Sequence, residues 1–76
     1  MLNRIRELRK TQKMSQELLA NKCDVSRQTI NAIENNKYDP SLVLAFKIAA
    51  ILDITVDELF QFQLAESKSE EDSNEK

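Results

Sequence analysis

A chain of 76 residues with a net charge of −2 can hold one small domain, and such a small core gives an isolated copy only marginal stability. It contains no histidine and a single cysteine, Cys23, so an intrachain disulfide and a conventional zinc site are excluded, and no metal or other cofactor is expected. The longest apolar stretch, residues 42–52, is interrupted by Lys47 and is shorter than the roughly 20 residues that cross a bilayer. Because nothing resembles a signal peptide or a membrane span, the expected location is the cytoplasm, and self-association is the expected source of further stability.

The charge is divided unevenly along the chain. Residues 1–37 carry eight lysines or arginines and four acids, whereas residues 38–76 carry three basic residues and nine acids. The first segment therefore has a net charge of +4 and the second of −6, which sum to −2. Because DNA affinity depends on the local neutralisation of phosphates, the basic first segment is the part expected to bind nucleic acid.

Three helices are expected in this basic segment. Apolar residues at helical spacing predict a first helix over about residues 3–13, with a basic outer face. Ser15 is a good N-cap for a second helix over about 16–22, and Ser26 is a good N-cap for a third over about 27–35.

Two further helices are expected after a loop around Pro40. Ser41 can cap a fourth helix over residues 42–52, and Thr55 can cap a short fifth helix over 56–59. The chain contains no glycine, which favours helices joined by tight turns.

The end of the chain changes character twice. Residues 60–64 alternate between apolar and polar side chains, which predicts a strand, and residues 1–3 are its best pairing edge. Residues 65–76 carry five acids and two lysines and have almost nothing to bury, so this acidic tail is expected to be disordered. The predicted fold is therefore an all-α, five-helix domain over residues 1–64 with a short C-terminal β-strand.

The second and third helices are separated only by residues 23–25, and apolar side chains on both can hold them at a fixed angle. Arg27, Gln28 and Asn31 would then project from the third helix. Arginine suits the O6 and N7 atoms of guanine, and glutamine or asparagine suits the N6 and N7 atoms of adenine. The pattern predicts that these three side chains contact bases in the major groove.

The same segment resembles the Cro/cI-type helix-turn-helix, the xenobiotic-response-element family of phage repressors and bacterial regulators. The resemblance covers about residues 3–60 and implies a DNA-binding transcriptional regulator. The motifs that carry it are Ser-Gln-Glu-Leu-Leu-Ala at 15–20, Val-Ser-Arg-Gln-Thr-Ile at 25–30, Ile-Glu-Asn at 33–35, Pro-Ser-Leu at 40–42 and Asp-Glu-Leu-Phe at 57–60.

The resemblance also implies roles for individual residues. Arg27, Gln28 and Asn31 fall at base-reading positions. Arg9 and Glu34 fall where the family often carries an ion pair between the first and third helices. Lys10, Lys13 and Lys22 are either ordinary surface charges or phosphate contacts. Gln16 is expected to contact phosphate and also to brace the third helix, which is the recognition helix of the motif. The other expected phosphate contacts are Thr29, Asn35, Lys37 and Lys10.

Two positions depart from the family pattern. Asp24 and Asn36 stand where the family usually has glycine, in the turn and after the recognition helix. Both positions favour a left-handed backbone, and aspartate and asparagine tolerate that conformation best after glycine. A small loss of stability with an unchanged fold is expected.

The fourth helix is apolar almost all round, whereas a one-sided surface helix would show only a stripe. Either the fifth helix and the 60–64 strand cover its second face, or a partner does. We favour a partner, in the form of a symmetric dimer. The expected dimer contacts are Ile51, Ile54, Phe60 and Phe62.

The function expected from the sequence is a homodimeric transcriptional regulator, a repressor, that binds an inverted-repeat operator in double-stranded DNA. No membrane or small-molecule ligand is expected, and the chain lacks the residues of an enzyme active site. Cys23 is interpreted as a small buried hydrophobe rather than a redox sensor. The alternative is an antitoxin-type interaction module that also binds its own operator, which the scarcity of apolar residues after Leu64 disfavours.

Overall fold

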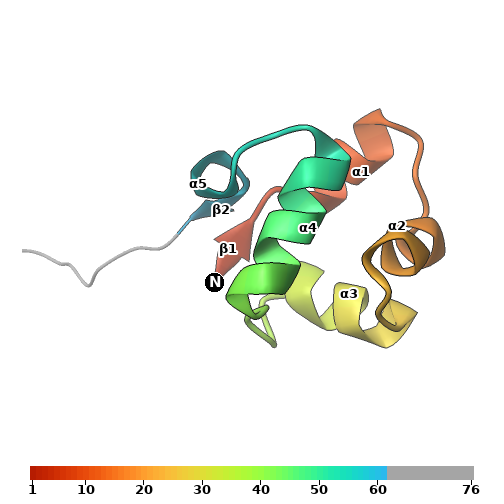
Figure 1. Cartoon of the computed structure of the whole chain (residues 1–76), viewed down its shortest axis with the longest axis horizontal. Coiled ribbons are helices and arrows are strands. Elements are labelled where there is room, and N and C mark those ends of the chain that lie inside the picture. The colour runs from red at the N-terminus through yellow and green to blue at the C-terminus, as the bar shows by residue number, and fades with distance from the viewer. Residues whose placement is uncertain (62–76) are drawn as a thin grey trace, which may run out of the picture.

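The computed structural model describes residues 1–61, which contain five helices and two short strands (Figure 1). In chain order the elements are β1 (Leu2–Asn3), α1 (Ile5–Thr11), α2 (Gln16–Cys23), α3 (Arg27–Glu34), α4 (Leu42–Leu52), α5 (Val56–Leu59) and β2 (Phe60–Gln61). α2 and α3 lie on one side of α4, and α5 with the two strands lies on the other (Figure 1). The acidic tail predicted for residues 65–76 lies outside the described residues, and so does residue 64, where the domain is predicted to end. Among residues 1–61, no helix combines the length and the apolar character that a bilayer crossing requires.

Serine side chains fix where three of the helices begin. Ser15, Ser26 and Ser41 have extended backbones, and each Oγ accepts a hydrogen bond from the backbone N–H three residues later. A cap of this kind stabilises a helix by about 1 kcal/mol. These starts agree with the sequence prediction. α2 ends one residue later than predicted, at Cys23, and α3 ends one residue earlier, at Glu34.

The sequence prediction for the first helix is wrong at both ends. Asn3 belongs to β1, and its Oδ1 accepts a hydrogen bond from the Ile5 N–H at 3.1 Å, so α1 begins only at Ile5. The helix ends before Lys13, because the Lys13 backbone is left-handed, with a φ of 57°. The Gln12 amide then donates to the Leu52 carbonyl at 2.9 Å and ties the end of α1 to the end of α4.

β2 is the described part of the strand predicted for residues 60–64. It pairs antiparallel with β1, so the N-terminal segment supplies the edge within the same chain. The Arg4 N–H donates to the Leu59 carbonyl at 2.9 Å and extends this connection. The register places Leu2 opposite Gln61 and Asn3 opposite Phe60.

All five helices contribute to one apolar core. Fully burying one large apolar side chain, such as that of leucine or isoleucine, stabilises the fold by about 1.5–3 kcal/mol. Cys23 lies in the same core, where burial raises the pKa of its thiol although Lys47 acts in the opposite direction. The thiol therefore stays protonated and packs as a small hydrophobe. The largest fully buried side chains are Ile5, Leu19, Ile30, Ile33, Ile48, Leu52 and Leu59.

Left-handed residues end two helices and follow two others. Asp24 has a φ of 60° and Asn36 a φ of 62°, as the departures from the family pattern indicated. Lys13 and Asp53 adopt the same conformation, with φ of 57° and 61°. Nothing in the sequence pattern marks Lys13, because lysine has no particular tolerance for this conformation.

Candidate nucleic-acid interface

α3 turns one face into the core and leaves another face exposed. Ile30 and Ile33 are fully buried, whereas Arg27, Gln28 and Asn31 are exposed. With 3.6 residues per turn, these three exposed positions fall within about 100° of the helix circumference. They form one continuous polar surface, the reading face (Arg27, Gln28 and Asn31), which is the surface predicted to contact DNA bases.

Asn31 is held by two neighbouring amides. The Nε2 of Gln16, at the start of α2, donates to Asn31 Oδ1 at 3.1 Å. The Nδ2 of Asn35 donates to the same oxygen at 3.2 Å and to the Asn31 backbone carbonyl at 2.9 Å. The oxygen of the Asn31 side chain therefore accepts two internal hydrogen bonds, and the side chain is oriented before any DNA is bound.

A buried carboxylate, that of Glu34, connects α1, α2 and α3. Arg9 Nε donates to Glu34 Oε2 at 2.7 Å, and Arg9 Nη2 donates to Oε1 at 3.3 Å. Gln16 Nε2 and Arg6 Nε reach Oε1 at 3.1 and 3.3 Å. Burial by itself raises the pKa of Glu34, but the hydrogen bonds from Arg9 and Gln16 and the charge of Arg9 together hold that pKa below its ordinary value. The carboxylate is therefore ionised at neutral pH, although its side chain is fully buried.

Residues 5–59 match the family model described as helix-turn-helix. The chain belongs to the Cro/cI-type helix-turn-helix family. It is accordingly a DNA-binding transcriptional regulator, with α2 and α3 as the two helices of the motif.

Relatives with the same helix-turn-helix span most of the chain. An uncharacterized HTH-type transcriptional regulator from Methanocaldococcus jannaschii is 48% identical over 63 residues, which are 83% of this chain and 96% of that protein. The restriction-modification controller protein C.AhdI from Aeromonas hydrophila has a similar crystal structure, with a TM-score of 0.70 at 40% identity, covering 75% of this chain and 86% of that one. SinR from Bacillus subtilis, the master regulator for biofilm formation, has been crystallised in complex with DNA; its TM-score is 0.64 at 35% identity, covering 70% of this chain and 86% of that one.

The residues predicted to contact phosphate fall into two groups in this helix-turn-helix. Lys10 and Lys37 are exposed. Gln16 and Asn35 instead direct their amide nitrogens to two internal acceptors each, and Thr29 Oγ1 lies 2.9 Å from the Oγ of its capping serine. A side-chain hydrogen bond from either amide nitrogen to phosphate would have to replace an internal one, whereas the backbone N–H of Gln16, the first residue of α2, needs no such exchange.

Arg6 is a member of the site that the sequence did not reveal. Besides its contact with Glu34, its Nη2 donates to Asn35 Oδ1 at 2.8 Å. The one sequence feature that could have pointed to Arg6 is its position three residues before Arg9, which places both arginines on one face of α1. That spacing does not identify the partner, because Glu34 is 28 residues away along the chain.

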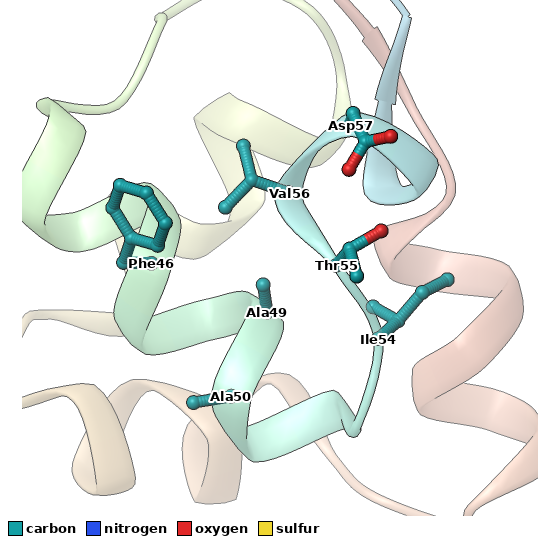
Figure 2. A pocket seen from close by; sticks show the side chains of 7 residues that line it. All are labelled: Phe46, Ala49, Ala50, Ile54, Thr55, Val56 and Asp57. Carbon is teal, nitrogen blue, oxygen red and sulfur yellow. The ribbon is translucent and has the colours of Figure 1, made fainter.

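A second, apolar surface lies on α4. Leu42, Val43 and Phe46 are 70%, 66% and 58% exposed, so α5 and β2 leave them uncovered. Beside Phe46 is an open hollow of about 460 Å³ (Figure 2), with Phe46, Ala49 and Ala50 along α4 and the other lining residues at the start of α5 and in the two residues before it. The hollow is lined by Phe46, Ala49, Ala50, Ile54, Thr55, Val56 and Asp57. We call the apolar part of this surface the apolar face (Leu42, Val43, Phe46, Ala50, Ile54 and Val56).

The residues predicted to form a dimer interface lie in different environments. Ile54 belongs to the apolar face, and Ile51 is half-buried against the core. Phe60 is buried within its own chain, at 8% exposure, and so contributes to the core that supports β2. Phe62 lies outside the described residues.

Proposed function

We propose that the chain is a homodimeric transcriptional repressor that binds an inverted-repeat operator with α3 in the major groove. The observation that carries the proposal is the reading face, because its three polar side chains stand on a helix whose opposite face is fixed in the core. The DNA complex of SinR, a protein similar to this chain, supports binding to double-stranded DNA. Repression requires only that the bound dimer occupy a site that transcription needs.

Arg27, Gln28 and Asn31 are the proposed base contacts. Neither Arg27 nor Gln28 makes a side-chain hydrogen bond within residues 1–61, so both can form base contacts without losing internal ones. Arginine can donate to both O6 and N7 of guanine, and glutamine can pair with N6 and N7 of adenine. Each such pair contributes about 1–3 kcal/mol of discrimination against a wrong base.

Phosphate contacts would set the position of α3 along the groove. Lys10 and Lys37 are proposed to bind phosphates through their exposed ammonium groups. Thr29, Gln16 and Asn35 are proposed to lie beside the DNA backbone. Contacts of this kind contribute affinity and register without reading sequence.

The apolar face is the proposed dimer contact. A two-fold axis places the same patch of both copies against itself, so an apolar patch is self-complementary. Burying Leu42 or Phe46 in a dimer interface would contribute up to about 1.5–3 kcal/mol for each side chain to the free energy of association. This is a large amount for so small a domain. A symmetric dimer with α3 helices about 34 Å apart binds half-sites whose centres are about 10 base pairs apart.

Selection from a library of random DNA duplexes with the full chain tests this proposal. The wild-type protein should enrich an inverted repeat with that spacing, and the triple variant Arg27→Ala/Gln28→Ala/Asn31→Ala should enrich none. Lys47→Ala, which removes an exposed charge from α4, is the matched control and should enrich the wild-type site. Enrichment of the same operator by the triple variant would show that α3 is not the reader, and a site without two-fold symmetry would contradict the dimer.

A further inference from the structure

Two charged side chains fix the direction of two amides beside the reading face. A carboxylate can only accept hydrogen bonds and a guanidinium can only donate them. Gln16 must therefore turn its nitrogen towards Glu34, at 3.1 Å, and Asn35 must turn its oxygen towards Arg6, at 2.8 Å. The orientations of both amides are thus determined by two charges, that of Glu34 at the end of α3 and that of Arg6 on α1.

These orientations determine the direction of a third amide, that of Asn31. The nitrogens of Gln16 and Asn35 both face Asn31, at 3.1 and 3.2 Å, so the atom that meets them must be its oxygen, Oδ1. An amide oxygen has two lone pairs, and both are engaged here. The Asn31 nitrogen, Nδ2, carries two hydrogens and has no acceptor within residues 1–61.

We propose that Asn31 acts towards DNA only as a hydrogen-bond donor and therefore selects guanine over adenine. This inference rests on the proposed function, because it requires α3 to lie in the major groove. Guanine offers two adjacent acceptors, N7 and O6, to a donating NH₂ group. The usual asparagine–adenine pair needs the amide oxygen to accept from adenine N6, and here that oxygen is already engaged.

Gln16 and Asn35 are positioning residues in this account, since they act through Asn31. A variant with both Gln16→Ala and Asn35→Ala frees the Asn31 oxygen and allows the amide to rotate. Adenine should then be accepted at the position where the wild-type protein selects guanine. A purely structural role for the two amides would lower affinity for all sequences equally and would leave the base preference unchanged.

The test uses the full chain and the operator that it selects from random duplexes. The base pair read by Asn31 is the one at which Asn31→Ala removes discrimination, and the base there is then replaced by each alternative and by 7-deazaguanine, which lacks N7. Binding followed by fluorescence anisotropy should favour guanine over adenine by about 5- to 150-fold, and 7-deazaguanine should weaken binding. Asn31→Asp keeps an oxygen for Gln16 and Asn35 but turns an acceptor outward, so its preference should change to cytosine, whose N4 donates.

The outcomes separate this inference from the function on which it rests. If Asn31→Ala alters discrimination at no position, Asn31 does not read bases and that part of the proposed function fails. If Asn31→Ala removes discrimination at a position where the wild-type protein prefers any base other than guanine, the base contact stands and the proposed selection of guanine is overturned. Circular dichroism checks that the variants are folded. If the Gln16→Ala/Asn35→Ala variant does not fold, the base preference of Asn31→Asp still tests the donor-only inference.

Discussion

The guanidinium of Arg9 lies 2.7 Å from the carboxylate of Glu34, and this contact fixes α3 against α1. The same guanidinium donates from Nη1 to the Met14 carbonyl at 2.8 Å, in the segment that leads into α2. One arginine thus connects all three helices around the reading face. Because the Arg9 side chain is only 10% exposed and that of Glu34 is fully buried, each charge depends on the other for its compensation.

Replacing Arg9 should therefore destabilise the domain strongly. Arg9→Ala leaves a buried carboxylate without its main partner and should lower the free energy of unfolding by about 3–5 kcal/mol. Arg6→Ala is the control, because Arg6 contacts the same carboxylate from a half-exposed position and should cost about 1 kcal/mol or less. Urea denaturation followed by circular dichroism measures both, and equal losses would contradict the account of the buried pair.

The stability that Glu34 contributes should depend on pH. Its pKa in the folded protein is held below the ordinary value, so the contribution is complete above about pH 4.5 and is lost as the pH falls through the folded-state pKa. The difference in unfolding free energy between the wild-type protein and Glu34→Gln should be constant near neutral pH and should shrink below about pH 4.5. Glu7→Gln, at an exposed carboxyl paired with Arg4, should change stability by less than about 1 kcal/mol. A difference for Glu34→Gln that grows in acid would refute the assignment.

Helix starts could be predicted from the sequence where a capping side chain marks them. Ser15, Ser26 and Ser41 precede α2, α3 and α4, and each forms the expected hydrogen bond. The start of α1 has no serine before it: Arg4 makes no side-chain cap, and Asn3, whose Oδ1 accepts from the Ile5 N–H, belongs to a strand that forms only through its distant partner, β2. The error at the start of α1 therefore comes from a contact between the two ends of the domain.

The left-handed turn between α2 and α3 should be sensitive to the residue at position 24. Asp24→Gly should change the free energy of unfolding by no more than about 1 kcal/mol. Glycine relieves the strain of the left-handed backbone, and this gain is offset because glycine gives the unfolded chain more conformational entropy. Asp24→Val should cost about 1–2 kcal/mol or more, because a β-branched residue is disfavoured at a φ of 60°. Lys22→Val, within α2, should cost at most about 0.7 kcal/mol and isolates the contribution of the left-handed backbone. Equal costs at positions 22 and 24 would argue against backbone strain.

The orientation of the site could be predicted only in part. The exposed positions on α3 followed from helical spacing, and the partner of Arg9 followed from the family pattern. The direction of the Gln16 and Asn35 amides could not be obtained in this way, because it depends on charges brought together from separate helices. In the same way, the apolar excess of α4 was evident, but the residues that stay uncovered depend on how α5 packs against it.

Salt dependence should separate the phosphate contacts from the base contacts. Lys37→Ala should reduce the slope of log K against log salt concentration by about one for each phosphate contact that is lost. Gln28→Ala carries no change of charge, so it should weaken binding to the operator and leave this slope unchanged. Titrations of the selected operator at several salt concentrations give both quantities. An unchanged slope for Lys37→Ala would remove Lys37 from the phosphate contacts.

The dimer should depend on the apolar face rather than on the core. Phe46 is 58% exposed in the single chain, so Phe46→Glu should leave the fold intact, whereas it places a charge in an interface that buries the ring. Sedimentation at micromolar concentration should show a dimer for the wild-type protein and a monomer for Phe46→Glu. Lys47 is the adjacent residue of α4, and the Lys47→Ala variant controls for changes that are not specific to the interface. This variant should remain dimeric. Because a monomer contacts only one half-site, Phe46→Glu should also bind the operator more weakly and with a shallower salt dependence. A Phe46→Glu protein that remains dimeric would place the interface on another surface, without affecting the reading face on α3.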